Sequence, residues 1–404
     1  MSPELQQDLP AYNYCALPLA RYACRPDETR GRVHAEPESR HRAAFQRDRD
    51  RIIHASAFRR LKYKTQVFVY HIGDHYRTRL SHTLEVAQIA RTMARSLMVN
   101  EDLAETVALA HDLGHTPFAH TGEDVLKECM KDYGGFEHND QSLRVLTTLE
   151  RKYPNWDGLN LTWETLEGVI KHNGPVKGKL NIAAQELQDQ VDMRLKTHAS
   201  MEAQVAALSD DIAYNNHDIE DGLRAGLFTL EELEDLSLLA RVLADIRSSY
   251  PGIAERYLVQ ELIREMIGAM VEDVLIETQM RLAKLKPESP EDIRMAGTQM
   301  VAFSKEMKID VANLRQFLFK RMYKHYTINR IKLKVENIVG DLFKAFHKNY
   351  TLLPDNWQSR IEEGGGGQDE RKRARFVADY IAGMTDRYAI REHERLFDLY
   401  WDLR

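Results

Sequence analysis

The sequence predicts an all-α protein, and three observations lead to that class. From about residue 40 onward, apolar residues recur at intervals of three and four, which is the period of an amphipathic helix. Only one stretch, KTQVFVY at 64–70, has the composition of a strand, so we expect at most a small β-hairpin near 64–72. The chain of 404 residues is 43% apolar and 29% charged, and it has no apolar run long enough to cross a bilayer.

The first 60 residues are expected to form an N-terminal segment that ends in a basic helix. Residues 40–64 carry nine Arg or Lys against two Asp, although the whole chain has a net charge of −6. A solvated helix face and a phosphate-facing surface both account for such a stretch. The start MSPELQQDLP lacks a signal-peptide pattern, and the three cysteines show no C-x-x-C spacing. These two features favour a reducing, cytoplasmic location.

The next elements form the expected core, residues 61–225. RLSHTLEVAQIARTMARSL (79–97) has one apolar stripe, formed by Leu80, Leu84, Ala87, Ala90, Ala94 and Leu97. EDLAETVALAHDLG (101–114) repeats the pattern and stops at Gly114 and Pro117, after which Thr121 is predicted to cap the next helix. Further helices are expected over 161–173, 198–225, 230–248, 255–285, 290–305, 310–324 and 328–348. Residues 226–404 are thus a C-terminal helical region, with a flexible Gly-rich loop at 362–372.

The stretch ALAHDLGHTPFAHTGED (108–124) indicates a metal site. His111 and Asp112 end an apolar helix, His82 lies one helix earlier, and Asp210 and Asp211 lie on a later helix. Imidazole and carboxylate ligands without cysteine suit Mn²⁺, Mg²⁺, Fe²⁺, Ni²⁺ or Zn²⁺. Two His and two Asp would leave coordination positions for water and a phosphate oxygen. The alternative is that these histidines are buried or cap helix ends.

Six blocks of the sequence indicate a protein family more specifically than the His-Asp pair does. They are FRRLKYKTQVF, TRLSHTLEVAQIAR, ALAHDLGHTPFAHTGE, FEHNDQSLRVL, DDIAYNNHDIEDG and ARFVADYIAGMTDRYA. Together they resemble the deoxyguanosine-triphosphate triphosphohydrolase family of the HD-domain phosphohydrolases, which includes the animal SAM-and-HD-domain dNTPase. The similar segments span about residues 30 to 400, so the resemblance covers nearly the whole chain.

The resemblance implies a role for each matching residue. The metal ligands would be His82, His111, Asp112 and Asp210. The catalytic residues would be His120, Glu123 and His138, with His115 of lesser weight. The substrate-binding residues would be Gln66, Arg79, Lys171, Tyr214 and Asp218. Asp210 is preferred to Asp211 because the family's ligand lies four residues before a tyrosine that packs on the sugar, and here that tyrosine is Tyr214.

The physical chemistry of these residues fits the implied roles. In the His120–Glu123 pair, the carboxylate can fix the imidazole's tautomer while the histidine handles a proton. The guanidinium of Arg79 suits bidentate contact with phosphate. The basic stretch would lie beside the pocket, with its end at Arg59, Arg60 and Lys62 facing phosphates. A tyrosine against the 2′-carbon would exclude a ribose hydroxyl.

By the same resemblance, the reaction splits a dNTP into a deoxynucleoside and tripolyphosphate, with Mn²⁺ or Mg²⁺ the expected ion. Family members form tetramers or hexamers, and some respond to dNTP effectors or single-stranded DNA. Two alternatives stay open. One is another HD-domain hydrolase, acting on nucleoside monophosphates, (p)ppGpp or cyclic nucleotides. The other is a nucleotide- or nucleic-acid-responsive binding protein. A sequence that lacked one of the four metal ligands would have favoured this second alternative.

Overall fold

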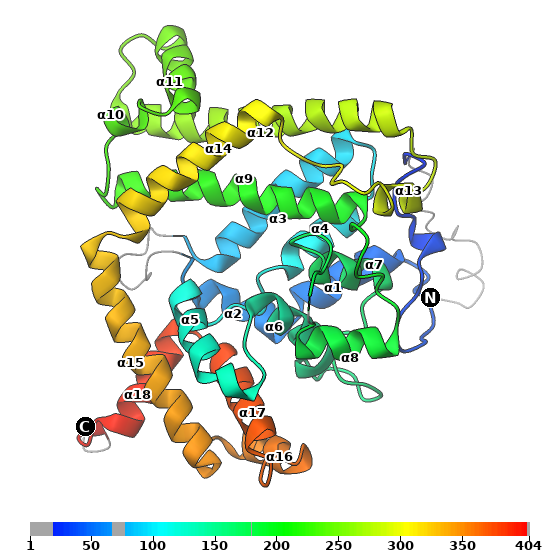
Figure 1. Cartoon of the computed structure of the whole chain (residues 1–404), viewed down its shortest axis with the longest axis vertical. Coiled ribbons are helices and arrows are strands. Elements are labelled where there is room, and N and C mark those ends of the chain that lie inside the picture. The colour runs from blue at the N-terminus through cyan, green and yellow to red at the C-terminus, as the bar shows by residue number, and fades with distance from the viewer. Residues whose placement is uncertain (1–18, 67–76, 179, 402–404) are drawn as a thin grey trace, which may run out of the picture.

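The computed structural model describes residues 19–66, 77–178 and 180–401, and it confirms an all-α fold (Figure 1). Within these residues, extended backbone pairs only at isolated bridges, one of which joins Thr65 to Thr78. The hairpin expected near 64–72 lies largely outside the described residues. None of the described helices combines the length and the apolar character needed to span a membrane.

The centre of the fold is a bundle in which α3, α4 and α9 pack against one another, with α1 and α7 against α4. Side-chain caps set where these helices begin: Asn100 accepts from the backbone N–H of Leu103 at 3.0 Å, and Ser200 from that of Ala203 at 3.3 Å. The helices of this half are α1 (Ala44–Ile53), α2 (Ser56–Arg60), α3 (Arg79–Ser96), α4 (Glu101–Ala110), α5 (Ala119–Cys129), α6 (His138–Arg144), α7 (Trp163–Ile170), α8 (Ile182–Gln190) and α9 (Met201–Arg224).

A second group of helices extends the same hydrophobic core. The long helix α12 packs on α9 and on α11, and α11 and α12 lie along one edge of the molecule, outside α9 (Figure 1). The group consists of α10 (Leu230–Leu233), α11 (Ser237–Ser249), α12 (Glu255–Leu285), α13 (Pro290–Arg294) and α14 (Lys305–Leu318). The helix expected over 290–305 is wrong beyond Arg294, because Ser304 caps a new helix there by accepting from the N–H of Met307 at 3.1 Å.

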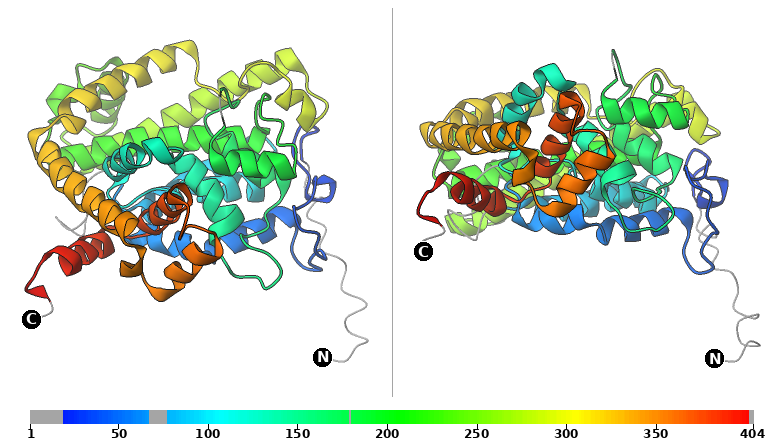
Figure 2. Two further views of the ribbon diagram at one scale, coloured as in Figure 1. Left: turned by 60° about the horizontal axis from the view of Figure 1, so that its bottom comes forward. Right: turned by 90° about the horizontal axis from the view of Figure 1, so that it is seen from below.

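The remaining helices form a separate hydrophobic core around α5. They are α15 (Tyr326–Lys348), α16 (Asp355–Glu363), α17 (Glu370–Ala382) and α18 (Asp386–Phe397). Figure 2 shows α18 at the opposite end of the molecule from residues 19–40. The two cores therefore cut across the expected division at residue 225, since α11–α14 join the central core while α5 joins the C-terminal helices.

The Gly-rich segment between α16 and α17, where a flexible loop was expected over 362–372, forms a hydrogen-bonded turn. Gly364 and Gly366 donate backbone hydrogen bonds to Arg360 and Ile361 at 3.0 and 2.7 Å. A Cβ on Gly364 would lie 2.4 Å from the ring of Phe376, so the missing side chain allows this close packing.

Helix α5 begins two residues before the predicted cap. Thr121 lies inside the helix, and Phe118 occupies the N-cap position with a left-handed φ of 63°. The N–H of Phe118 donates to Asp386 Oδ1 at 2.9 Å, so a contact with the distant α18 fixes this turn. Tertiary structure has therefore overridden the local capping signal.

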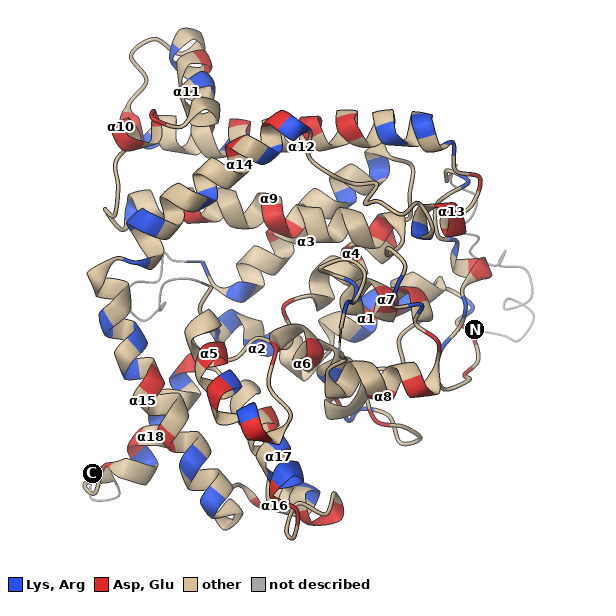
Figure 3. Ribbon diagram, viewed as in Figure 1, with Lys and Arg blue, Asp and Glu red and all other residues tan. Residues whose placement is uncertain are grey.

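Acidic partners neutralise much of the basic stretch in the described structure. Arg47 and Arg51 both pair with Glu36, and Arg49 pairs with Asp102 and Glu105. Elsewhere, Lys and Arg are interspersed with Asp and Glu along helices such as α12 and α17 (Figure 3). Arg47, Arg49 and Arg51 are therefore held by acids rather than free to bind phosphate, and since Arg51 and Lys64 are buried, the solvated interpretation holds only for the exposed part of residues 40–64.

Candidate functional site

A cavity of about 400 Å³ gathers most of the residues expected to act. Its wall comes from the starts of α3, α5 and α6, the end of α4, the turn after α7, the middle of α9, and the end of α14 with the turn that follows it. The lining residues are Gln66, Arg79, His82, His111, Asp112, His115, His120, His138, Asn139, His172, Asp210, Asp211, Tyr214, Asn215, Arg315, Leu318, Phe319 and Tyr323. Nine of the twelve predicted site residues thus line this cavity, and Glu123 and Asp218 bind residues that do.

Two histidines and two aspartates converge at one end of this cavity. His82 Nε2 lies 3.0 Å from Asp210 Oδ1, and His111 Nε2 lies 3.6 Å from the same oxygen. His111 Nε2 also lies 3.3 Å from Asp112 Oδ1. His82, His111 and Asp112 are buried, and each offers a ligand atom within 4.8 Å of the others. Such a group can hold a divalent metal ion.

The environment of His111 tests whether this set fits a cation. Its Nδ1–H donates to the carbonyl of Ala108 at 2.7 Å, so Nε2 is the nitrogen that can offer a lone pair to a metal ion, which displaces any proton there. Nε2 is buried and makes no hydrogen bond to any described residue. Burial would lower the pKa of His111, but the charges of Asp112 and Asp210 outweigh it and raise the pKa to about 9. The site therefore attracts positive charge.

A second cluster centres on Glu123. Its Oε1 accepts from His138 Nδ1 at 2.8 Å and from the His138 backbone N–H at 2.9 Å, while Oε2 lies 3.5 Å from His120 Nδ1. Burial would raise the pKa of Glu123, but hydrogen bonds from the two histidines hold it well below its usual range. Glu123 is therefore a carboxylate that orients two imidazoles.

His115 connects the two clusters. Its ring stacks on that of His138 with 4.1 Å between centroids, and its Nε2 lies 3.1 Å from Asp112 Oδ1. Gly114 makes this arrangement possible, because a Cβ there would lie 2.1 Å from the backbone nitrogen of Ser142 in α6. The close approach lets α6 carry His138 to the cavity.

Aromatic side chains and Arg315 form the other end of the cavity. Tyr214 and Tyr323 share a hydrogen bond of 2.6 Å between their hydroxyls, and Tyr323 also donates to Asp218. Asp218 is buried behind the tyrosines and does not line the cavity itself. Arg315 donates to Asp211 Oδ1 at 2.8 Å. Tyr323 lies on the π-helical turn η8 (Phe319–Tyr323), a feature frequent at functional sites.

Lys171 does not line the cavity. Its ammonium group is buried and donates to Glu167 Oε1 and Thr197 Oγ1, both at 2.9 Å. Its neighbour His172 lines the cavity instead, with Nε2 3.4 Å from Asp210 Oδ2. Arg59, Arg60 and Lys62 are also absent from the lining.

Replacing Lys171 by methionine is expected to lower the free energy of unfolding by about 1–3 kcal/mol, because Glu167 and Thr197 would each lose a hydrogen bond. KM and kcat should stay at wild-type values, because the ammonium group is turned away from the cavity. Denaturant unfolding and steady-state kinetics would check this, with the exposed Lys177→Met as control. A raised KM with unchanged stability would restore Lys171 as a phosphate ligand.

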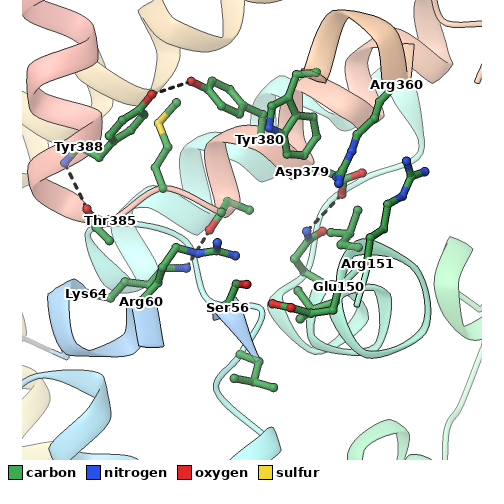
Figure 4. A pocket seen from close by; sticks show the side chains of 18 of the residues that line it. Ser56, Arg60, Lys64, Glu150, Arg151, Arg360, Asp379, Tyr380, Thr385 and Tyr388 are labelled. Carbon is green, nitrogen blue, oxygen red and sulfur yellow. Dashed lines mark hydrogen bonds between the residues drawn. The ribbon is translucent and has the colours of Figure 1, made fainter. Parts of the chain in front are cut away.

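A second cavity, of about 450 Å³, lies where α2 meets α17 and α18. Figure 4 shows Arg60, Arg151 and Arg360 at its wall, together with Tyr380 and Tyr388, whose hydroxyls are 3.1 Å apart. None of the histidines of the two clusters lines it. Although slightly larger, it therefore lacks the groups needed for metal-assisted hydrolysis.

Comparison with known proteins gives matches over the same regions. A family model described as HD domain matches residues 79–215, and one described as Phosphohydrolase-associated domain matches residues 301–395. Relatives named deoxyguanosinetriphosphate triphosphohydrolase-like protein occur in Parvibaculum lavamentivorans and a Caulobacter species, at 56% and 55% identity over 387 residues. These alignments cover 94% and 95% of this chain and 97% of each relative. A Bradyrhizobium relative of that name is 52% identical and is covered to 99%.

Proposed function

Because the chain belongs to the deoxyguanosinetriphosphate triphosphohydrolase-like family of HD-domain phosphohydrolases, we propose that it cleaves a dNTP into a deoxynucleoside and tripolyphosphate. The observation that carries the proposal is that one cavity holds both a metal-ligand set and a histidine–carboxylate cluster, joined through His115. Hydrolysis of a phosphate ester needs both a means of neutralising charge and a means of moving protons.

His82, His111, Asp112 and Asp210 would hold the metal ion. Their donor set fits Mn²⁺ or Mg²⁺ and would also accept Fe²⁺, Ni²⁺ or Zn²⁺. When bound, the ion supplies Lewis-acid polarisation of the bond between the α-phosphorus and the 5′-oxygen.

The chain's own residues would do the rest. Glu123 holds His120 and His138 in place, and one of these imidazoles would give a proton to the leaving 5′-oxygen or take one from the attacking water. Arg79 is buried beside Asp112, with Nη1 2.9 Å from Oδ2, and it lines the cavity where it can contact phosphate oxygens. Arg315 offers a second guanidinium group at the wall.

Tyr214 and Tyr323 would select the sugar. Their hydroxyls are fixed by each other and by Asp218, so the rings form a rigid wall against which a deoxyribose can pack. A 2′-hydroxyl would meet this wall, which favours deoxynucleotides. Gln66, whose buried Oε1 has no partner among the described residues, would receive a hydrogen bond from the sugar. The resemblance to the family also leads us to expect a homo-oligomer that can respond to dNTPs or single-stranded DNA.

A product assay tests the proposal. The protein would be incubated with Mn²⁺ and each dNTP singly, then with all four together, and the products separated by chromatography. We expect a deoxynucleoside and tripolyphosphate, lost in Asp112→Ala, and activity only in the mixture would indicate an effector. Orthophosphate released from monophosphates, with triphosphates left intact, would replace the proposal by an HD-domain nucleotidase.

A further inference from the structure

The two histidines of the metal-ligand set are anchored in different ways. His111 is held by a backbone carbonyl, which can only accept a hydrogen bond. The Nδ1 of His82 instead faces another imidazole, His217 Nδ1, at 3.2 Å. Both rings are buried, at 1% and 2% exposure, so water does not replace this contact. An imidazole can donate or accept, and the pair alone therefore does not fix which nitrogen of His82 carries the proton.

The outer side of His217 removes this ambiguity. Its Nε2 contacts the carboxylate of Glu85, and Arg77 Nε donates to the same carboxylate at 3.2 Å. Glu85 lies one turn after His82 on α3, with 42% of its side chain exposed, and the adjacent Arg77 favours its ionised form. An ionised carboxylate only accepts hydrogen bonds.

The positions of the protons follow in order from this outer end. Because Glu85 only accepts, the proton of neutral His217 lies on Nε2, and His217 Nδ1 presents a lone pair. His82 must then donate from Nδ1, which leaves a lone pair on Nε2. That nitrogen points at Asp210 Oδ1, 3.0 Å away, so two acceptors face each other where a cation would bind. The opposite tautomer of both rings would set the lone pair of His217 Nε2 against the Glu85 carboxylate.

We propose that His217 and Glu85 are positioning residues that fix the tautomer of His82, so that its Nε2 is available to the metal ion. The inference rests on the metal site of the proposed function. It adds two residues outside the cavity to the determinants of metal affinity. It also means that a half-exposed carboxylate on α3 controls a buried ligand through one intervening imidazole.

Metal affinity, measured separately from hydrolysis, tests the proposal. Mn²⁺ would be titrated calorimetrically into chelator-treated full-length protein. His217→Phe keeps a ring but removes the acceptor, and we expect the Kd for Mn²⁺ to rise about 10- to 100-fold. His217→Gln keeps a carbonyl acceptor and should recover much of the affinity. Glu85→Ala should weaken binding less than His217→Phe does, since His217 could then adopt either tautomer.

Glu101→Ala is the matched control for Glu85→Ala. Glu101 also pairs with an arginine, Arg95, at 2.7 Å, but it lies at the far end of α4 from His111, about 15 Å along the helix. This variant should bind Mn²⁺ like the wild type. Thermal unfolding of each variant shows whether a loss of affinity comes with a loss of folding.

A second measurement leaves Glu85, His217 and His82 unchanged. In metal-free protein labelled with ¹⁵N-histidine, we expect a scalar coupling between His82 Nδ1 and His217 Nδ1 across their hydrogen bond. A His82 proton on Nε2 would overturn the proposal, as would a folded His217→Phe protein that binds Mn²⁺ like the wild type. If the wild type bound no metal ion, the metal site itself would fail. Loss of triphosphate hydrolysis with intact metal binding would instead contradict only the proposed reaction.

Discussion

Replacing Glu123 by glutamine is expected to slow dNTP hydrolysis by about 10²- to 10⁴-fold, the range typical of general acid–base catalysis. Glutamine keeps the size of the side chain but removes the negative charge that favours the protonated imidazoles. Burial alone would lower the pKa of His138, but its hydrogen bond to Glu123 and the charge of that carboxylate raise it. Without that charge, the histidines would be poorer proton donors to the leaving 5′-oxygen. The measurement is kcat with Mn²⁺ and the preferred dNTP.

Metal binding must be followed in the same variant, since Glu123 is no member of the proposed ligand set. The Kd for Mn²⁺ should remain at the wild-type value. Glu137→Gln is a suitable control, because Glu137 Oε1 also lies near His138 Nδ1, at 3.7 Å, but its main role is to cap α6. A rate close to wild type in Glu123→Gln would show that the cluster around Glu123 is structural.

The sequence was sufficient to locate the helices that carry the site. Helix α9 was expected over 198–225 and runs over Met201–Arg224, because its apolar residues repeat with helical period and Ser200 caps it. The same periodicity places Asp210 and Tyr214 one turn apart on the face that meets the cavity. Predictions of this kind depend on one helix only, and they need no knowledge of how helices pack.

What the sequence could not supply depends on packing between distant segments. Lys171 and His172 are adjacent, and only the orientation at the end of α7 decides that His172 reaches the cavity. Tyr323 and Arg315 lie more than 90 residues after Asp218 and join the site because α14 crosses α9. One signal was available for His172, namely its position in IKHNGP just before a helix-breaking Gly-Pro.

Exchanging Asp210 and Asp211 for alanine, one at a time, is expected to separate metal binding from substrate binding. Asp210→Ala removes the oxygen that lies 3.0 Å from His82 Nε2 and 3.6 Å from His111 Nε2. The Kd for Mn²⁺ should rise by more than about 100-fold, beyond the range seen when only outer contacts of a ligand are lost. The rate should fall by about 10³-fold or more. The bound ion stabilises charge in the transition state by several kcal/mol, and each loss of about 1.36 kcal/mol slows the reaction tenfold.

Asp211→Ala is the matched comparison, because the two residues share a helix, a charge and a place on the cavity wall. Asp211 accepts from Arg315 Nη2 at 2.8 Å, whereas Asp210 faces His82, His111 and His172. Its loss should leave metal affinity unchanged and free Arg315, so that any effect falls on KM. Calorimetric titration with Mn²⁺ and steady-state kinetics on both variants distinguish the outcomes. Loss of the metal in Asp211→Ala alone would reverse the ligand assignment, whereas unchanged affinity in both would remove α9 from the metal site.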